Sequence, residues 1–80
     1  MTREQAIAVA EGRRQELGID PRMELDSAEK AVVQYKRLPR LRGRAKDRVA
    51  WVITYAGKWG VAEVHVDDAR GKILRVRRSA

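Results

Sequence analysis

The chain has 80 residues and a net charge of +7, with 44% hydrophobic residues and no Cys. This length fits one domain with a thin core, so we expect no deep enclosed ligand cavity. The lack of Cys excludes a disulfide framework and a thiolate metal site.

The N-terminal residues predict a helix. Thr2 and Gln5 have the spacing of a capping box, in which each side chain bonds the backbone N–H of the other residue. Apolar residues then recur at three- and four-residue spacing up to Leu17. We expect the helix to run to Leu17 and to end at Gly18, with Ile19 folding back onto its last turn.

Residues 26–37 carry conflicting signals. The segment 26–29 (Asp-Ser-Ala-Glu) is typical of a helix start, whereas 31–35 (Ala-Val-Val-Gln-Tyr) has the β-branched and aromatic content of a strand. We favour a strand near 31–37, because Val33 and Tyr35 share a face and the C-terminal half also predicts strands. A helix over this segment stays the alternative.

One segment makes the chain basic. Residues 36–48 hold seven basic side chains and one acidic one. Because Pro39 and Gly43 interrupt it, we expect an exposed connection between strands at about residues 38–48.

Three further strands are expected at 49–55, 61–66 and 72–77. Trp51 and Tyr55 should face the core, whereas Glu63 and His65 should share a solvent-exposed face. The turn at residues 67–71 should use Gly71 for a positive φ, and Leu74 and Val76 should face inward. The sequence thus predicts an α+β domain, with an N-terminal helix packed on one face of a three- to four-stranded antiparallel sheet.

The sequence also resembles a family. An alanine-rich helix (residues 5–10), a Trp strand (51–55) and a Val-Asp-Asp-Ala-Arg-Gly-Lys-Ile-Leu turn (66–74) resemble the PepSY domain. The resemblance covers residues 1–17 and 49–77. The chain departs from the family pattern in three ways: Arg70 stands where the family usually has Thr, Asp68 is an additional acidic residue, and the basic segment is an insertion. It implies a non-catalytic module that inhibits or regulates a peptidase or binds another protein.

Two candidate contact sites follow from the residues. The basic segment could bind phosphates by releasing counterions, and the residues for such polyanion binding are Arg40, Arg42, Arg44, Lys46 and Arg48; the alternative is a solvated loop. Trp59, in a hairpin between two glycines, is a candidate partner anchor, or else it folds over the hairpin edge.

The remaining polar residues are expected to have structural roles and not catalytic or metal-binding ones. His65 is the only His, and the ligand and nucleophile patterns of metal or catalytic sites are absent, so a surface imidazole is expected. Asp67 and Asp68 fit turn chemistry better than a calcium loop. We expect no enzyme, no cofactor and no metal.

The first hypothesis for function is therefore a PepSY-like protein-binding or regulatory module, with an unidentified protein partner. The alternative is nucleic-acid or polyanion binding through residues 36–48. No segment reaches the ~20 apolar residues of a membrane span. As written the chain is expected in the cytoplasm, or secreted or envelope-associated if a leader segment was removed. The sequence leaves the oligomeric state open.

Overall fold

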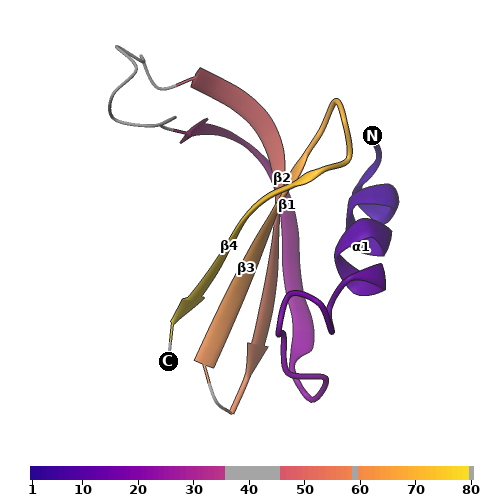
Figure 1. The fold of residues 1–80 in the computed structure, drawn as a ribbon, viewed down its shortest axis with the longest axis vertical. Helices are drawn as coiled ribbons and strands as arrows, with labels where there is room; N and C mark the ends of the chain where they lie inside the picture. The colour runs from indigo at the N-terminus through magenta and orange to yellow at the C-terminus, as the bar shows by residue number, and fades with distance from the viewer. Residues whose placement is uncertain (36–45, 59, 80) are drawn as a thin grey trace.

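The computed structural model describes residues 1–35, 46–58 and 60–79. One helix precedes four strands in the chain (Figure 1): α1 (Arg3–Gly12), β1 (Glu24–Tyr35), β2 (Lys46–Gly57), β3 (Gly60–Asp67) and β4 (Ile73–Ser79). The strands pair in chain order, β1-β2-β3-β4, and every neighbouring pair is antiparallel. With α1 on one face, the sheet has the expected α+β arrangement.

The capping box at the start of α1 is present. Thr2 Oγ1 accepts from the backbone N–H of Gln5 over 3.1 Å, and Gln5 Oε1 accepts from the backbone N–H of Thr2 over 2.8 Å. Two small residues of the helix, Ala6 and Ala10, are fully buried against the sheet. Because alanine adds so little bulk, the helix backbone lies close to the strands.

The helix ends earlier than the apolar spacing predicts. Regular α-helix stops at Gly12, and residues 13–18 continue as irregular turns. Glycine disfavours helix because it loses the most backbone freedom on folding. The expected terminus is nevertheless formed at Gly18, which has φ +70°. Ile19 N–H donates to the carbonyl of Arg14 over 3.0 Å, and the Ile19 side chain is buried.

β1 begins at Glu24, so the alternative of a helix over this segment is wrong. Eleven of its twelve residues pair with β2, from Glu24↔Ala56 to Tyr35↔Lys46. One irregularity interrupts the register between Leu25 and Ser27, where Asp26 is the additional residue. Pairing along most of β2 outweighs the local helix signal.

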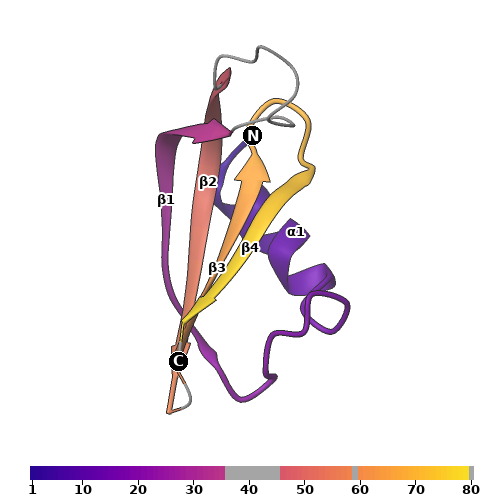
Figure 2. The ribbon, with the colours of Figure 1, turned by 60° about the vertical axis from the view of Figure 1, so that its left-hand side comes forward.

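The core lies between α1 and the sheet. Its largest fully buried side chains are Tyr55, Ile53, Val64 and Val66. Trp51 is half-buried and packs against this cluster. The helix packs mainly over β1, β2 and β3; Figure 2 shows it behind the sheet, with the four strands in the order β1-β2-β3-β4 in front.

In β4, Ile73 faces the core in place of Leu74, which the sequence predicted to face inward. A register irregularity places Ile73 opposite Val66 and Arg75 opposite His65, so Leu74 is the additional residue. Ile73 and Val76 pack against the core, where Leu74 and Val76 were expected. A bulge changes which residues of a strand share a face, and simple alternation cannot foresee it.

β1 and β2 continue beyond the four-stranded part. Pairing of β2 with β3 ends at Ala50↔Asp67, whereas pairing with β1 runs on to Tyr35↔Lys46. The resulting two-stranded extension, residues 32–35 and 46–49, is called the β1–β2 ribbon below; it bends away from α1 (Figure 1). Val32, 68% exposed, lies in it. β2 thus starts three residues earlier than expected, and Lys46 and Arg48 belong to a strand.

Candidate interaction surface

The sheet face opposite α1 carries aligned polar residues from all four strands. The register sets Glu29, Val52, His65 and Arg75 side by side in one row across the sheet. A second row contains Ser27, Thr54, Glu63 and Arg77. We call this surface the helix-free face. Its charged residues come from segments that are distant in sequence and meet only through the strand pairing.

His65 is buried in this face, so the expectation of a surface imidazole is wrong. The residue is 5% exposed, because β3 is an interior strand with Val52 on one side and Arg75 on the other. Burial lowers the pKa of His65 below 6.5; nearby Glu63 opposes this effect, whereas Arg75 and Arg77 add to it. Nε2 lies 3.7 Å from Glu63 Oε1. Burial thus favours the neutral imidazole over the imidazolium.

Asp67 stabilises the β3–β4 turn, as its residue type suggests. Its Oδ1 accepts from the backbone N–H of Ala69 over 3.0 Å, and its carbonyl accepts from the N–H of Gly71 over 2.8 Å. Gly71 has the expected positive φ, +66°. The second carboxylate oxygen of the buried Asp67 accepts from Arg48 Nη1 over 3.0 Å. Arg48 is thus ion-paired within the sheet.

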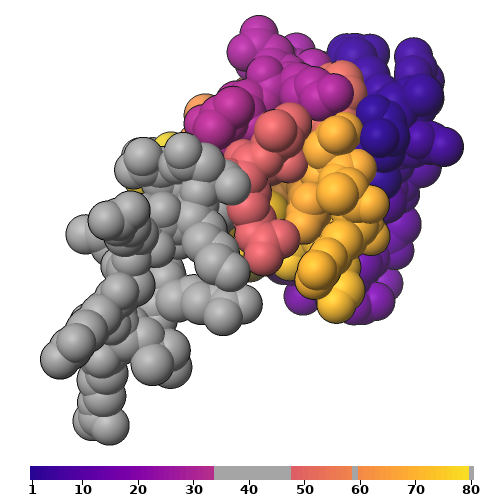
Figure 3. Space-filling view, turned by 90° about the horizontal axis from the view of Figure 1, so that it is seen from above, coloured from indigo at the N-terminus to yellow at the C-terminus, as the bar shows by residue number. Residues whose placement is uncertain are grey.

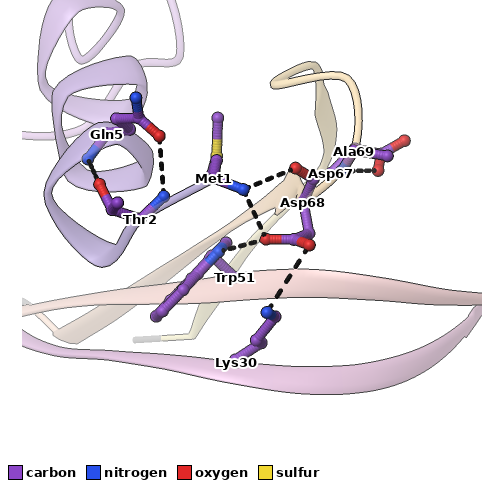
Figure 4. A network of polar contacts seen from close by, with 8 residues as sticks. All are labelled: Met1, Thr2, Gln5, Lys30, Trp51, Asp67, Asp68 and Ala69. Carbon is purple, nitrogen blue, oxygen red and sulfur yellow. Dashed lines mark hydrogen bonds and ion pairs between the residues drawn. The ribbon is translucent and has the colours of Figure 1, made fainter.

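Asp68 joins three segments on the other face (Figure 4). Its Oδ1 accepts from Trp51 Nε1 over 2.9 Å and from the Met1 nitrogen over 3.2 Å. Its Oδ2 lies 3.7 Å from Lys30 Nζ. The hydrogen bond from Trp51, followed by that from Met1, lowers the pKa of Asp68. Figure 3 shows the β3–β4 turn (orange) between β2 (salmon) and the N-terminal segment (indigo).

Arg14 was not foreseen as an important residue. Its Nη2 donates to the carbonyls of Asp20 and Met23 over 3.0 and 2.6 Å, and its guanidinium lies 4.7 Å from the centroid of the Tyr55 ring. It therefore fixes the connection between α1 and β1 above the core. No sequence pattern reveals this role, because the fold alone brings the two carbonyls near Nη2; only the ion pair of Nη1 with Glu11 follows from sequence spacing.

Most of the candidate contact residues lie outside the described part of the chain. This holds for Arg40, Arg42, Arg44 and the proposed anchor Trp59. Lys46 is the first residue of β2, and Arg48 is held by Asp67. The ends of the basic segment are brought together by the Tyr35↔Lys46 pair at the end of the β1–β2 ribbon.

β4 offers a second basic surface at the edge of the sheet. Residues 70–79 hold five basic side chains and no acidic one. Arg75 and Arg77 lie on the helix-free face and are exposed. Arg78 is exposed on the opposite face, where its Nη2 donates to the carbonyl of Leu17. β4 thus combines positive charge on both faces with an outer edge that no other described strand pairs with.

The described residues include no group of three or more His, Cys, Asp or Glu that could hold a metal ion. Nor is any helix among them long and apolar enough to span a membrane. No protein-family model, curated protein or solved structure matches the chain significantly. The function must therefore be argued from the strand edge, the ribbon and their charges.

Proposed function

We propose that this protein is a non-catalytic protein-binding or regulatory module, similar in kind to a PepSY domain, that binds an extended segment of a partner. The observation that carries the proposal is β4, a seven-residue edge strand whose outer side has no neighbouring strand in the part of the chain that the structure describes. An extended peptide can join such an edge through main-chain hydrogen bonds. The resemblance of residues 1–17 and 49–77 to PepSY domains also supports a protein-binding function.

Selection from a random peptide library displayed on phage tests this proposal. The immobilised protein should enrich a set of related peptides, and synthetic copies should bind in fluorescence anisotropy with dissociation constants of about 1–100 µM, a range typical of short linear segments. A small basic protein of similar net charge serves as the control. Equal enrichment on both proteins would contradict the proposal.

The β1–β2 ribbon favours a second candidate function, which is polyanion or nucleic-acid binding. The ribbon extends beyond β3 and β4, and it brackets residues 36–45, which contain five basic side chains and no acidic one. Two-stranded ribbons with basic residues are one of the elements that proteins use to contact DNA grooves and phosphates.

Anisotropy with labelled duplex and single-stranded DNA and RNA at two salt concentrations distinguishes this candidate. Binding through residues 36–45 should weaken steeply with salt. It should be lost in the Arg40→Ser, Arg42→Ser, Arg44→Ser triple variant. A matched triple variant, Arg13→Ser, Lys58→Ser, Arg70→Ser, should bind as the wild type does. No binding at low salt, or equal loss in both variants, would exclude a role for this segment.

A further inference from the structure

We infer that the outer edge of β4 binds an acidic extended segment of a partner protein, which pairs with β4 as a fifth strand. This inference rests on the proposed protein-binding function and specifies the chemistry of the partner. The site comprises β4 from Arg75 to Ser79, the regular part of the strand after its bulge. Main-chain groups supply the pairing, and side chains supply the selection.

The geometry of β4 leaves room for another strand. β4 is at one end of the sheet order and pairs only with β3 among the described strands. The helix packs mainly over β1, β2 and β3. Val76 packs against the core but stays only half-buried at this edge. An apolar side chain of an added strand would bury it further, on the same face as α1.

The charges of β4 select an acidic partner. Arg75 and Arg77 are two positions apart, so they lie on one face of the strand at a spacing of about 7 Å. A paired segment presents its own alternate residues at the same spacing, and acidic side chains there meet both arginines. Because Arg70 and Lys72 precede the site in the chain and Arg78 lies within it, a basic segment would be repelled.

The same features argue against a second copy of this chain as the occupant. Pairing β4 with β4 of another copy would bring Arg75, Arg77 and Arg78 close to their own counterparts. The other edge strand, β1, does carry Glu24, Asp26 and Glu29, but the bulge at Asp26 interrupts its regular edge. We therefore assign the edge to another protein.

Fluorescence anisotropy with synthetic peptides tests the inference. The probe is a labelled peptide of about eight residues, a usual strand length, in which Glu and Val alternate. It should bind the wild-type protein, and a Lys and Val peptide should not. Two further probes carry N-methyl groups on one or the other alternate set of amides. One set should abolish binding and the other should leave it intact, because only every second N–H of an added strand faces β4.

Two charge-matched variants locate the site. Arg75→Glu with Arg77→Glu should weaken binding of the Glu and Val peptide at least about tenfold, whereas Arg13→Glu with Lys58→Glu should bind as the wild type does. All four side chains are exposed, and circular dichroism checks that both variants fold. The N-methylated probes use the wild-type protein, so their result does not depend on a variant.

Each contrary result has a defined meaning. Equal weakening in both variants, or equal binding of both N-methylated peptides, would show general charge attraction and overturn the inference. Sedimentation that reveals self-association, lost in Glu24→Lys with Glu29→Lys, would identify a second copy as the occupant and also overturn it. If only non-acidic phage-selected peptides bind, the inference fails and the proposed function stands. If no peptide of any class binds, both fail.

Discussion

Trp51 and Asp68 form a hydrogen bond that ties the middle of the sheet to the β3–β4 turn. The indole Nε1–H donates to Asp68 Oδ1 over 2.9 Å, and the same oxygen accepts from the Met1 nitrogen. One carboxylate thus connects β2, the turn and the segment that precedes α1, while Lys30 adds an ion pair from β1. The helix start and the turn are therefore expected to depend on each other.

Asp68→Ala should lower the melting temperature and expose Trp51. The variant removes the acceptor of the indole N–H and the partner of Lys30. In a Trp59→Phe background Trp51 is the only indole, so a red shift of its fluorescence reports the local change. Glu29→Ala, which removes an exposed carboxylate of β1, is the control and should change neither quantity. Identical behaviour of the two variants would contradict the role of Asp68.

The contribution of Asp68 to stability should be lost at acid pH. Its pKa in the folded protein lies below the ordinary value of 3.8, so the unfolded chain takes up the proton first as the pH falls. The contribution is complete above about pH 4 and is lost as the pH falls through the lower, folded-state pKa. Urea denaturation between pH 5 and pH 2 should show a smaller loss of unfolding free energy in Asp68→Asn than in the wild type. A parallel decline in both proteins would refute this.

Two glycine substitutions at the ends of the helical segment should have opposite effects. A Cβ at Gly12 meets no heavy atom within 4 Å, so Gly12→Ala should extend α1 and raise the free energy of unfolding by about 0.5–1 kcal/mol. Gly18 has φ +70°, and a Cβ there would lie 2.6 Å from Arg78 Nη2. Gly18→Ala should therefore destabilise the protein by at least about 1 kcal/mol. Denaturation curves of the two variants provide the check, and a shift of equal sign would contradict it.

The sequence predicts those structural features that depend on neighbouring residues, and it fails for those that depend on distant ones. The capping box of Thr2 and Gln5 and the positive φ of Gly71 arise from neighbouring residues, and both were predicted correctly. The length of β1, the bulge at Leu74 and the burial of His65 depend on partners many residues away. Alternation predicts that two faces differ, but it does not say which residues of the second face become buried.

The two proposed binding surfaces could likewise be predicted from the sequence only in part, because strand pairing positions them. The basic segment is visible in the sequence, yet only strand pairing shows that its ends meet at a protruding ribbon. The two-residue spacing of Arg75 and Arg77 already sets both on one side of a strand. Their position at an unpaired edge follows from the strand order, which a single sequence does not determine.

Tyr55→Phe should leave stability unchanged or raise it by up to about 1 kcal/mol. The ring is fully buried, and the hydroxyl has no hydrogen-bond partner of good geometry among the described residues. Burial, with a smaller contribution from the Glu11 carboxylate, raises the pKa of Tyr55 to about 12. Removing the hydroxyl ends the cost of its desolvation and keeps the ring beneath Arg14. Urea denaturation at pH 7 measures the free energy of unfolding. Tyr55→Leu is the control, because it removes the ring as well as the hydroxyl. A marked loss of unfolding free energy in Tyr55→Phe would contradict the prediction and reveal a hydrogen bond to Glu11.

The neutral, buried His65 should make the protein less stable below pH 6.5. Its folded-state pKa is lower than that of the unfolded chain, because burial and the arginines at 75 and 77 disfavour the imidazolium more than Glu63 favours it. The stabilising contribution is therefore complete above pH 6.5 and is lost as the pH falls through the folded-state pKa. For one proton the slope cannot exceed about 1.4 kcal/mol per pH unit.

Urea denaturation at pH 8, 7, 6 and 5.5 measures this slope. His65→Gln keeps a polar side chain of similar size but cannot take up a proton, so its unfolding free energy should be nearly constant over the same range. A second variant, Glu63→Gln, removes the group that favours the imidazolium, so it should steepen the slope. If His65→Gln keeps the full pH dependence of the wild type, another group is responsible. If Glu63→Gln flattens the slope instead, the carboxylate and not burial sets the protonation state of His65.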